Sequence, residues 1–285
     1  FRIKGIKSTN PIAVGDSVEF DIENKGDEEI GVIKLIHDRK NYIVRKSVNL
    51  SKQTQIIASN IDLAFLLITI NNPPTLTTFI DRFLVTAQAY SIKVILVFNK
   101  IDSYKVEEKS EILYLKDIYE TIGYTCVEVS AIKNINLNII KDLMKGKTSL
   151  FSGHSGVGKT TLLNSLEPGL NLKTKEISFQ HQQGQHTTTF AEMFDLSFDA
   201  KIIDTPGIRA FGLSHIDNQR IVDAFSDLSE VAANCLSNCS HSESSCTLDA
   251  WASPAGVANP HRIARLASLR SLLAVKDSPP PAIED

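Results

Sequence analysis

The feature that most constrains the fold is the stretch GHSGVGKTTLLN, which begins at Gly153. It fits the pattern G-x-x-x-x-G-K-[ST] through Gly153, Gly158, Lys159 and Thr160. TSLFS before it predicts a strand and TTLLNSL after it predicts a helix. Backbone N–H groups and the positive helix end would then face a phosphate, whereas a chance glycine-rich turn lacks such flanks. The predicted phosphate-binding residues are Gly153, His154, Ser155, Gly156, Val157, Gly158, Lys159, Thr160 and Thr161.

Apolar segments on both sides of this loop predict a parallel sheet covered by helices. DLAFLLITI and IKVILVFNK are almost continuously apolar, as is typical of strands buried on both faces. YTCVEVSA and AKIIDTPG predict further strands, and EILYLKDIYETIG and NIIKDLM predict helices. Another helical stripe comprises Leu76, Phe79, Ile80, Phe83, Leu84 and Ala87. We therefore expect residues 53–213 to form an α/β domain with its sites at the carboxyl ends of the strands.

The segment IIDTPG is a second candidate phosphate motif. Asp204 would hold Mg²⁺ through water, and the N–H of Gly207 would contact a γ-phosphate. In the loop described above, Lys159 would bridge the β- and γ-phosphates and Thr160 would ligate Mg²⁺. Taken alone, DTPG is also compatible with an ordinary turn.

The segments NKID and SAIK indicate which base is bound. Asn99 can contact the guanine edge, and the carboxylate of Asp102 can accept hydrogen bonds from guanine N1–H and N2–H₂. Adenine lacks this donor pair, so such a site rejects it. The aliphatic stem of Lys100 would cover the ring, and Ser130 and Ala131 would bring a backbone N–H to guanine O6. Each short motif alone is compatible with a turn, but together they favour GTP over ATP.

The base-reading motifs precede the phosphate loop along the chain. A fold tolerates this order when its original termini are joined and new ones are opened elsewhere on the surface. The order therefore predicts a circularly permuted GTPase domain.

Residues 1–52 predict a small β-barrel of the oligonucleotide-binding type. FRIKGI, SVEFDI, IGVIKLI and NYIVR read as strands, and apolar alternation in SVEFDI predicts a half-buried one. A five-stranded barrel would need residues before Phe1, so we expect a truncated barrel. Basic residues that can contact RNA phosphates are Arg2, Lys4, Lys7, Lys34, Arg39, Lys40, Arg45 and Lys46. A solvated barrel surface is the alternative for this set.

The segment CLSNCSHSESSC predicts a metal centre. Cys235, Cys239, His241 and Cys246 are a ligand set for tetrahedral Zn²⁺, with free buried thiols as the alternative. Such clustering favours a reducing compartment. We expect residues 214–276 to form a helical zinc-binding domain and residues 277–285 a disordered tail.

The segment ANPHRIARLASLRSLLAV predicts the last helix. Asn259 would cap it, with Pro260 at its first position. Its apolar face would comprise Ile263, Leu266, Leu269 and Leu273. For Arg262, Arg265 and Arg270, a solvated helix face and an RNA contact are the two interpretations.

Composition limits the class of protein. The chain has 285 residues, 42% hydrophobic and 22% charged, with a formal net charge of −3, which is ordinary for a globular protein. No apolar run approaches the ~18–20 residues that span a bilayer, and no secretory leader is evident. We therefore expect a cytoplasmic protein, and nothing suggests an obligate dimer, so we expect a monomer.

The order and content of these motifs resemble the RsgA (YjeQ) family of circularly permuted GTPases that mature the small ribosomal subunit. The resemblance runs through AVGD, DRKNYIVR, NIDLAFLL, FNKID, SAIK, GHSGVGKTTLLN, GQHTTT, IIDTPGIRAFGL and the cysteine cluster. It implies a barrel, a permuted GTPase domain and one zinc per chain. It also implies action on the 30S subunit, with a 16S rRNA contact through the barrel. The cysteine spacings here are shorter than the family pattern, which puts the zinc site in question.

The catalytic residues follow from the same resemblance. Ile208 occupies the position after DTPG where many GTPases carry a water-orienting Gln. QGQHTTT corresponds to the mobile switch segment, in which Thr188 would sense Mg²⁺ and γ-phosphate and His186 would position water. The alternative for His186 is a solvent-exposed loop histidine.

We therefore expect a GTPase that hydrolyses GTP to GDP and phosphate and cycles on and off the immature small subunit. Two other functions remain open. One is an RNA-binding assembly factor that uses GTP as a sensor with negligible turnover, and the other is a GTPase with a different RNA or protein partner.

Overall fold

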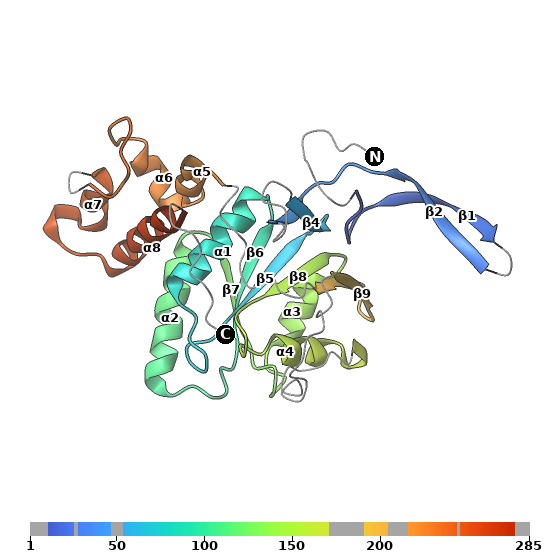
Figure 1. The fold of residues 1–285 in the computed structure, drawn as a ribbon. Helices are drawn as coiled ribbons and strands as arrows, with labels where there is room; N and C mark the ends of the chain where they lie inside the picture. The colour runs from blue at the N-terminus through green and yellow to red at the C-terminus, as the bar shows by residue number, and fades with distance from the viewer. Residues whose placement is uncertain are drawn as a thin grey trace, which may run out of the picture.

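A six-stranded sheet organises the centre of the computed structural model (Figure 1), which describes residues 11–25, 28–46, 54–170, 191–204, 216–243 and 246–276. The strand order is β7–β6–β5–β8–β10–β9. All these strands run parallel except β9, which pairs antiparallel with β10. The strands are β5 (Leu63–Ile68), β6 (Lys93–Phe98), β7 (Thr125–Glu128), β8 (Thr148–Ser152), β9 (Glu192–Leu196) and β10 (Ala200–Asp204).

The order of the strands reverses between β5 and β8. From β5 the chain adds β6 and β7 on one side, and it then returns to place β8 and β10 on the other side. Open α/β sheets bind ligands in the crevice at such a switch point, beyond the carboxyl ends of the strands. The fold therefore places the predicted base-reading and phosphate motifs at the carboxyl ends of strands on the two sides of this switch point.

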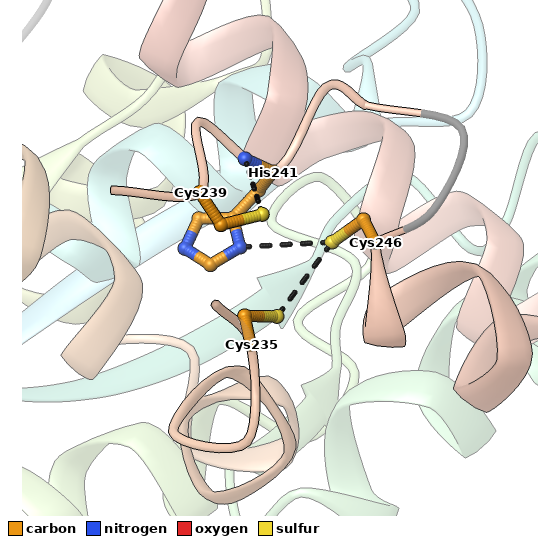
Figure 2. Close-up of side chains that lie close together, drawn as sticks. All are labelled: Cys235, Cys239, His241 and Cys246. Carbon is orange, nitrogen blue, oxygen red and sulfur yellow. Dashed lines mark hydrogen bonds between the residues drawn. The ribbon is translucent and has the colours of Figure 1, made fainter. Parts of the chain in front are cut away.

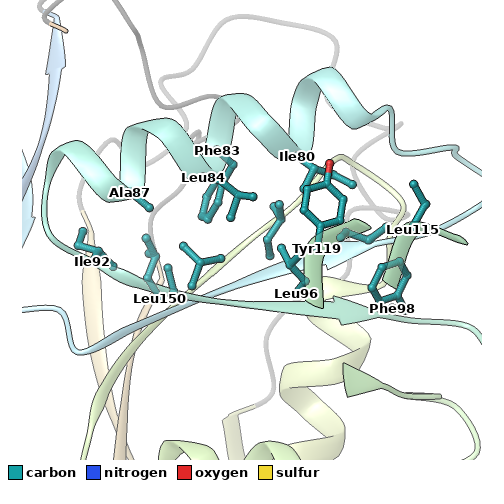
Figure 3. Packing of buried hydrophobic residues seen from close by; sticks show 14 of the residues in the cluster. Ile80, Phe83, Leu84, Ala87, Ile92, Leu96, Phe98, Leu115, Tyr119 and Leu150 are labelled. Carbon is teal, nitrogen blue, oxygen red and sulfur yellow. The ribbon is translucent and has the colours of Figure 1, made fainter. Parts of the chain in front are cut away.

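Helices cover both faces of the sheet, as the apolar strands require. On one face lie α1 (Thr77–Ala89) and α2 (Val106–Thr121), and on the other lie α3 (Leu137–Met144) and α4 (Lys159–Leu166), followed by η1 (Pro168–Leu170). Alternate β5 residues enter the two cores: Leu66 joins the first, while Phe65 stacks on Phe151 in the second, with ring centroids 4.7 Å apart. Figure 3 shows α1 packed on β6, with the side chains of Leu115 and Tyr119 from α2 beside Phe98. This confirms the predicted α/β architecture, although β9 was not predicted.

The N-terminal segment forms two separate two-stranded sheets in the described residues, so the predicted barrel is not confirmed. Hairpin β1 (Val18–Lys25) and β2 (Glu28–Ile36) reaches away from the central sheet (Figure 1). Phe20 and Ile22 on β1 are 57% and 63% exposed, so the prediction of a half-buried strand is wrong there. The predicted strand FRIKGI lies outside the described residues.

The second pair consists of β3 (Tyr42–Lys46) and β4 (Thr54–Ser59). These two strands lie on either side of the domain limit predicted at residue 52. Ile43 and Ala58 are fully buried and belong to the core of the central domain. Burial of Ile43 and Ala58 in this core explains why β3 and β4 stay against the central sheet, while the β1–β2 hairpin extends from it.

Arg39 and Lys40 of the predicted basic patch make ion pairs within the protein. Arg39 donates two hydrogen bonds of 2.6 Å to Asp16, with both side chains more than 90% buried. Lys40 pairs with Asp62. Arg39 is therefore unavailable to RNA, because leaving Asp16 would bury an unpaired carboxylate.

A third core lies in the C-terminal helices. These are α5 (Asn218–Asp223), α6 (Ser226–Ala232), α7 (Thr247–Ala252), η4 (Pro254–Gly256) and α8 (Pro260–Lys276). Leu266, Leu269 and Leu273 are buried as predicted, but Ile263 is 42% exposed. The predicted cap is confirmed, since Asn259 Oδ1 accepts a hydrogen bond from the N–H of Arg262.

The arginines of α8 contact the protein itself. Arg265 is 5% exposed and pairs with Asp81 of α1 and Asp227 of α6, so the interpretation as a solvated helix face is wrong for this residue. Arg270 pairs with Asp249. Arg262 lies over the ring of Trp251 and donates to its backbone carbonyl. A buried arginine needs carboxylate partners, and sequence alone did not reveal those supplied by α1 and α6.

In the part of the chain that the structure describes, no helix combines the length and apolarity needed to cross a bilayer.

Candidate functional site

The phosphate-loop sequence joins the end of β8 to the first residue of α4, as predicted. Gly158 adopts a φ of +91°, which side chains disfavour, and a Cβ there would lie 2.5 Å from Nδ2 of Asn99. Only glycine therefore allows the loop to approach the base-reading segment this closely. Val157 is fully buried, Ser155 is exposed, and Thr160 and Thr161 are half-buried at the start of α4.

Asn99 connects three of the predicted motifs. Its side chain is 1% exposed, and Nδ2 donates a 2.9 Å hydrogen bond to the carbonyl of Val157 in the phosphate loop. Its Oδ1 accepts a 3.2 Å bond from the N–H of Ala131 in SAIK. The N–H that we predicted for guanine O6 thus binds Asn99 in this structure. One amide side chain therefore holds together the segments that follow β6, β7 and β8 at the carboxyl ends of these strands.

Lys100 and Asp102 occupy different surroundings within NKID. Lys100 Nζ donates to the carbonyls of Asn72 and Gly156, at 2.6 and 2.7 Å, and burial lowers the pKa of its ammonium group. The carboxylate of Asp102 is exposed and accepts a hydrogen bond from the Ser130 hydroxyl. Asp102 is therefore oriented by Ser130 and still accessible to a ligand.

His154 of the phosphate loop packs on Phe79 of α1, with ring centroids 3.7 Å apart. Burial lowers the pKa of His154 below its usual 6.5, so the ring is neutral at pH 7. The contact attaches the phosphate loop to α1.

Asp204 ends β10, which pairs with β8, and its backbone therefore lies at the same sheet edge as the phosphate loop. The predicted roles of His186, Thr188 and Gly207 fall on positions outside the described residues.

The four predicted zinc ligands converge despite their short spacing (Figure 2). Their ligand atoms all lie within 4.8 Å of one another. Sγ of Cys246 is 3.8 Å from Sγ of Cys235 and 3.7 Å from Nδ1 of His241. Zn–S bonds of about 2.3 Å in a tetrahedron place the sulfur atoms about 3.8 Å apart. The donor set of three thiols and one imidazole therefore fits Zn²⁺ in both chemistry and spacing.

Sequence reasoning missed Tyr104 and Asn72, which contact the base-reading segment. The hydroxyl of Tyr104 donates a 2.7 Å hydrogen bond to the carbonyl of Asn99. A tyrosine two residues after NKID was the available signal in the sequence. Its second partner, the N–H of Ile70 on the loop between β5 and α1, is brought to it only by the tertiary fold. Asn72 acts through its backbone, which leaves no signature in the sequence.

Comparison with known proteins places the chain in a family. The RsgA GTPase family model matches residues 36–214. The chain is 62% identical over 244 residues to the small ribosomal subunit biogenesis GTPase RsgA of Christiangramia forsetii, covering 85% of this chain and 78% of the relative. Its identity to RsgA of Bacteroides fragilis is 49% over 242 residues, with 85% and 77% covered.

Solved structures share the fold. YjeQ from Thermotoga maritima matches with a TM-score of 0.71 at 29% identity, covering 92% of this chain and 84% of that one. YloQ, described as a circularly permuted GTPase, matches with a TM-score of 0.67 at 25% identity, covering 98% and 87%. With the family model matching most of the chain and a relative at 62% identity, the chain belongs to the RsgA GTPase family and is a GTP hydrolase.

Proposed function

We propose that this GTPase binds the small (30S) ribosomal subunit and hydrolyses GTP to GDP and phosphate during late assembly of the subunit. The observation that carries the proposal is the set of hydrogen bonds by which Asn99 joins NKID, SAIK and the phosphate loop at one edge of the sheet. The relatives named as small ribosomal subunit biogenesis GTPases support the partner.

The proposed site offers a separate group for each part of the nucleotide. Asp102 reads the N1–H and N2–H₂ edge of guanine, and the stem of Lys100 covers the ring. At the other end, the N–H groups of the phosphate loop and Lys159 hold the phosphates. Thr160 and Asp204 would hold Mg²⁺, which neutralises charge on the β- and γ-phosphates when bound.

Hydrolysis needs a group that orients water, and Ile208 cannot hydrogen-bond. We assign this role to His186, with Thr188 sensing Mg²⁺ and the γ-phosphate and Gly207 offering its N–H to that phosphate. Binding of the subunit would bring His186 to its position beside the γ-phosphate, so the subunit would accelerate turnover.

The Cys₃His cluster would hold one structural Zn²⁺ per chain. All four positions of a tetrahedral ion would be filled by protein, which leaves no open position for chemistry. Hydrogen bonds around the cluster fix its shape. In one of them, Nε of Arg270 donates to the carbonyl of His241 at 2.7 Å. The role would be to join α6 to α7.

We propose that the N-terminal segment of this chain contacts 16S rRNA and that Arg39 takes no part in this contact. Lys34 on β2 lies near Asp21 and Glu23, with its side chain 49% exposed. Such surface pairs are weak and exchange readily for phosphate contacts. A function on the ribosome places the protein in the cytoplasm, and we propose that it acts as a monomer.

The test is GTP turnover by the full chain with and without purified 30S particles, with ATP as the control nucleotide. The proposal predicts turnover of GTP but not ATP and stimulation by 30S. Equal rates with and without 30S would contradict the proposed partner and favour another one. Binding without turnover under both conditions would favour the nucleotide-sensor alternative.

A further inference from the structure

Tyr104 lies in the chain between NKID and the first residue of α2. Its side chain is 6% exposed, and its hydroxyl makes two hydrogen bonds. It donates to the carbonyl of Asn99 at 2.7 Å and accepts from the N–H of Ile70 at 3.2 Å. Burial raises the pKa of Tyr104 to about 12, so the hydroxyl remains a donor throughout the physiological range. Tyr104 therefore links the segment after β6 to the loop after β5.

The loop after β5, residues 69–76, contacts the base-reading segment at further points. The carbonyl of Asn72 accepts from Lys100 Nζ, which also donates to Gly156 of the phosphate loop. A Cβ on Gly156 would lie 3.2 Å from Cδ of Pro73, so the two loops are in close contact. Thr69 donates through its hydroxyl to the carbonyl of Pro73, which holds the loop in a compact turn.

Every polar group of Asn99 is thereby fixed from a different direction. Its N–H donates to the carbonyl of Ile68 at 2.9 Å, and its side chain binds Val157 and Ala131. Its carbonyl binds only Tyr104 among the described contacts. The next residue, Lys100, adopts a left-handed φ of +67°. Because that conformation is unfavourable for a side chain, the surrounding hydrogen bonds must hold it in place.

We propose that Tyr104 is a positioning residue for guanine recognition, which acts by fixing the backbone between Asn99 and Asp102 against the loop after β5. The inference rests on the nucleotide site proposed above. Tyr104 faces the carbonyl of Asn99 and not the phosphate loop, so it sets base affinity and selectivity and leaves the chemical step unchanged.

Tyr104→Phe tests this with little change in volume, because only the hydroxyl is removed. The change leaves the Ile70 N–H and the Asn99 carbonyl without their partner in a buried site. A lost hydrogen bond of this kind corresponds to about five- to tenfold in binding. The matched control is Tyr119→Phe, since Tyr119 is also a buried tyrosine, and its hydroxyl donates to Asp81 of α1 at 3.1 Å and not to the backbone of NKID.

The measurements are dissociation constants for GDP and IDP, thermal unfolding without nucleotide, and 30S-stimulated kcat at saturating GTP. IDP lacks the N2 amine, so the ratio of its dissociation constant to that of GDP reports how well Asp102 is placed. For Tyr104→Phe we expect GDP binding about five- to tenfold weaker, a smaller IDP/GDP ratio and kcat within about twofold of wild type. Tyr119→Phe should lower thermal stability and leave both dissociation constants unchanged.

The inference would be overturned if Tyr104→Phe lowered the unfolding temperature as Tyr119→Phe does and kept wild-type GDP affinity and selectivity. The hydroxyl would then serve stability alone. If wild-type protein itself bound GDP and IDP equally, the proposed guanine site would be wrong, and the inference with it.

Discussion

Single residues at the contact between the phosphate loop and NKID can be replaced by few other residue types, because each is fixed by several neighbours at once. Gly158 shows this most clearly, since both its backbone conformation and the space beside it exclude a side chain. Asn99 is the neighbour that fills that space, and both Nδ2 and Oδ1 of its amide are already hydrogen-bonded. A change at either residue therefore alters the distance between the phosphate loop and the base-reading segment.

Gly158→Ala should weaken GDP binding by about tenfold or more, because its methyl group would displace Asn99. The matched control is Gly123→Ala, which has a similar φ of +93° but nothing within 4 Å of the added Cβ. Both variants should lose roughly 1–2 kcal/mol of stability from the left-handed backbone. Calorimetric titration with GDP separates the two effects, and equal loss of binding in both variants would contradict the explanation by contact with Asn99.

Asp16 should make stability depend on acid. Burial alone would raise its pKa, but hydrogen bonds from Arg39, Ser59 and the backbone of Ala13 more than offset this and hold the pKa of Asp16 below its usual value. A group whose pKa is lower in the folded state stabilises the fold above its unfolded pKa of about 4 and loses that contribution as the pH falls further. Asp16→Asn should therefore lower the unfolding free energy at pH 7, by about 1–3 kcal/mol.

Urea unfolding of wild type and Asp16→Asn between pH 7 and pH 3 provides the check. The difference between the two proteins should shrink once the pH falls below about 4. A difference that stays constant over the whole range would show that the charge of Asp16 is not what stabilises the pair.

Among the elements, α1 has contacts in two directions. Phe79 in its first turn packs on His154 of the phosphate loop. Two residues later, Asp81 pairs with Arg265 of α8, and Val85 joins the core of the C-terminal helices. Arg265 also packs over the ring of Phe225, 4.3 Å from its centroid. The central and C-terminal parts of the chain are therefore joined through α1, and His261 of α8 adds a contact with Tyr114 and Asp117 of α2.

Arg265→Met should destabilise the protein by about 3–5 kcal/mol, because Asp81 and Asp227 would be left buried without their partner. The control is Arg220→Met, which removes an exposed ion pair with Asp217 and should cost less than about 1 kcal/mol. Chemical unfolding of the two variants gives both values. Similar small losses would mean that the buried pair contributes little to joining α1 and α8.

Zinc removal should act on the C-terminal helices first, because Cys235 follows α6 and Cys246 precedes α7. Purified protein should contain one equivalent of zinc per chain by elemental analysis. Cys239→Ser should lose both the zinc and the separate first transition in which the C-terminal helices unfold. Cys126→Ser is the control, since this cysteine lies on β7 outside the cluster. Wild-type protein without bound zinc, yet fully stable, would favour free thiols.

At the scale of the whole molecule, the sheet restores an arrangement that the chain order conceals. The strands that precede the proposed base-reading motifs, β6 and β7, lie on one side of β5, and the strands that precede the proposed phosphate motifs, β8 and β10, lie on the other. Contact between Asn99 and Val157 closes a gap of 58 residues. A rearranged chain order is compatible with the site because the site depends on neighbouring strand ends, not on the order of their connection.

At the scale of the whole molecule, catalysis should also depend on the 30S subunit. His186→Ala should bind GTP with wild-type affinity and lose about 100-fold or more of the 30S-stimulated turnover, as expected when a group that positions water is removed. His181→Ala, five residues earlier in the same segment, is the control and should retain stimulation. Single-turnover assays with purified 30S particles measure both, and wild-type turnover in His186→Ala would remove this residue from the mechanism.

The sequence by itself determined the motifs whose residues are close neighbours in the chain. The phosphate loop, NKID and the cap at Asn259 depend on backbone conformation and hydrogen bonds within a few residues, and such patterns are local. Long apolar strands likewise indicated a sheet covered on both faces. The predicted convergence of the zinc ligands agrees with the structure for the same reason, since they lie within twelve residues of one another.

Only the tertiary structure decided the partners of residues distant in the chain. Arg265 read as exposed because its carboxylate partner Asp81 lies 184 residues away. The role of Tyr104 was missed because its hydroxyl binds backbone atoms, and Ile70 on the loop after β5 is brought to it only by the fold. Phe20 alternated like a half-buried residue, yet the described fold leaves it exposed. Burial and pairing are properties of surfaces that meet in space, and a local pattern specifies which face is apolar without specifying what covers it.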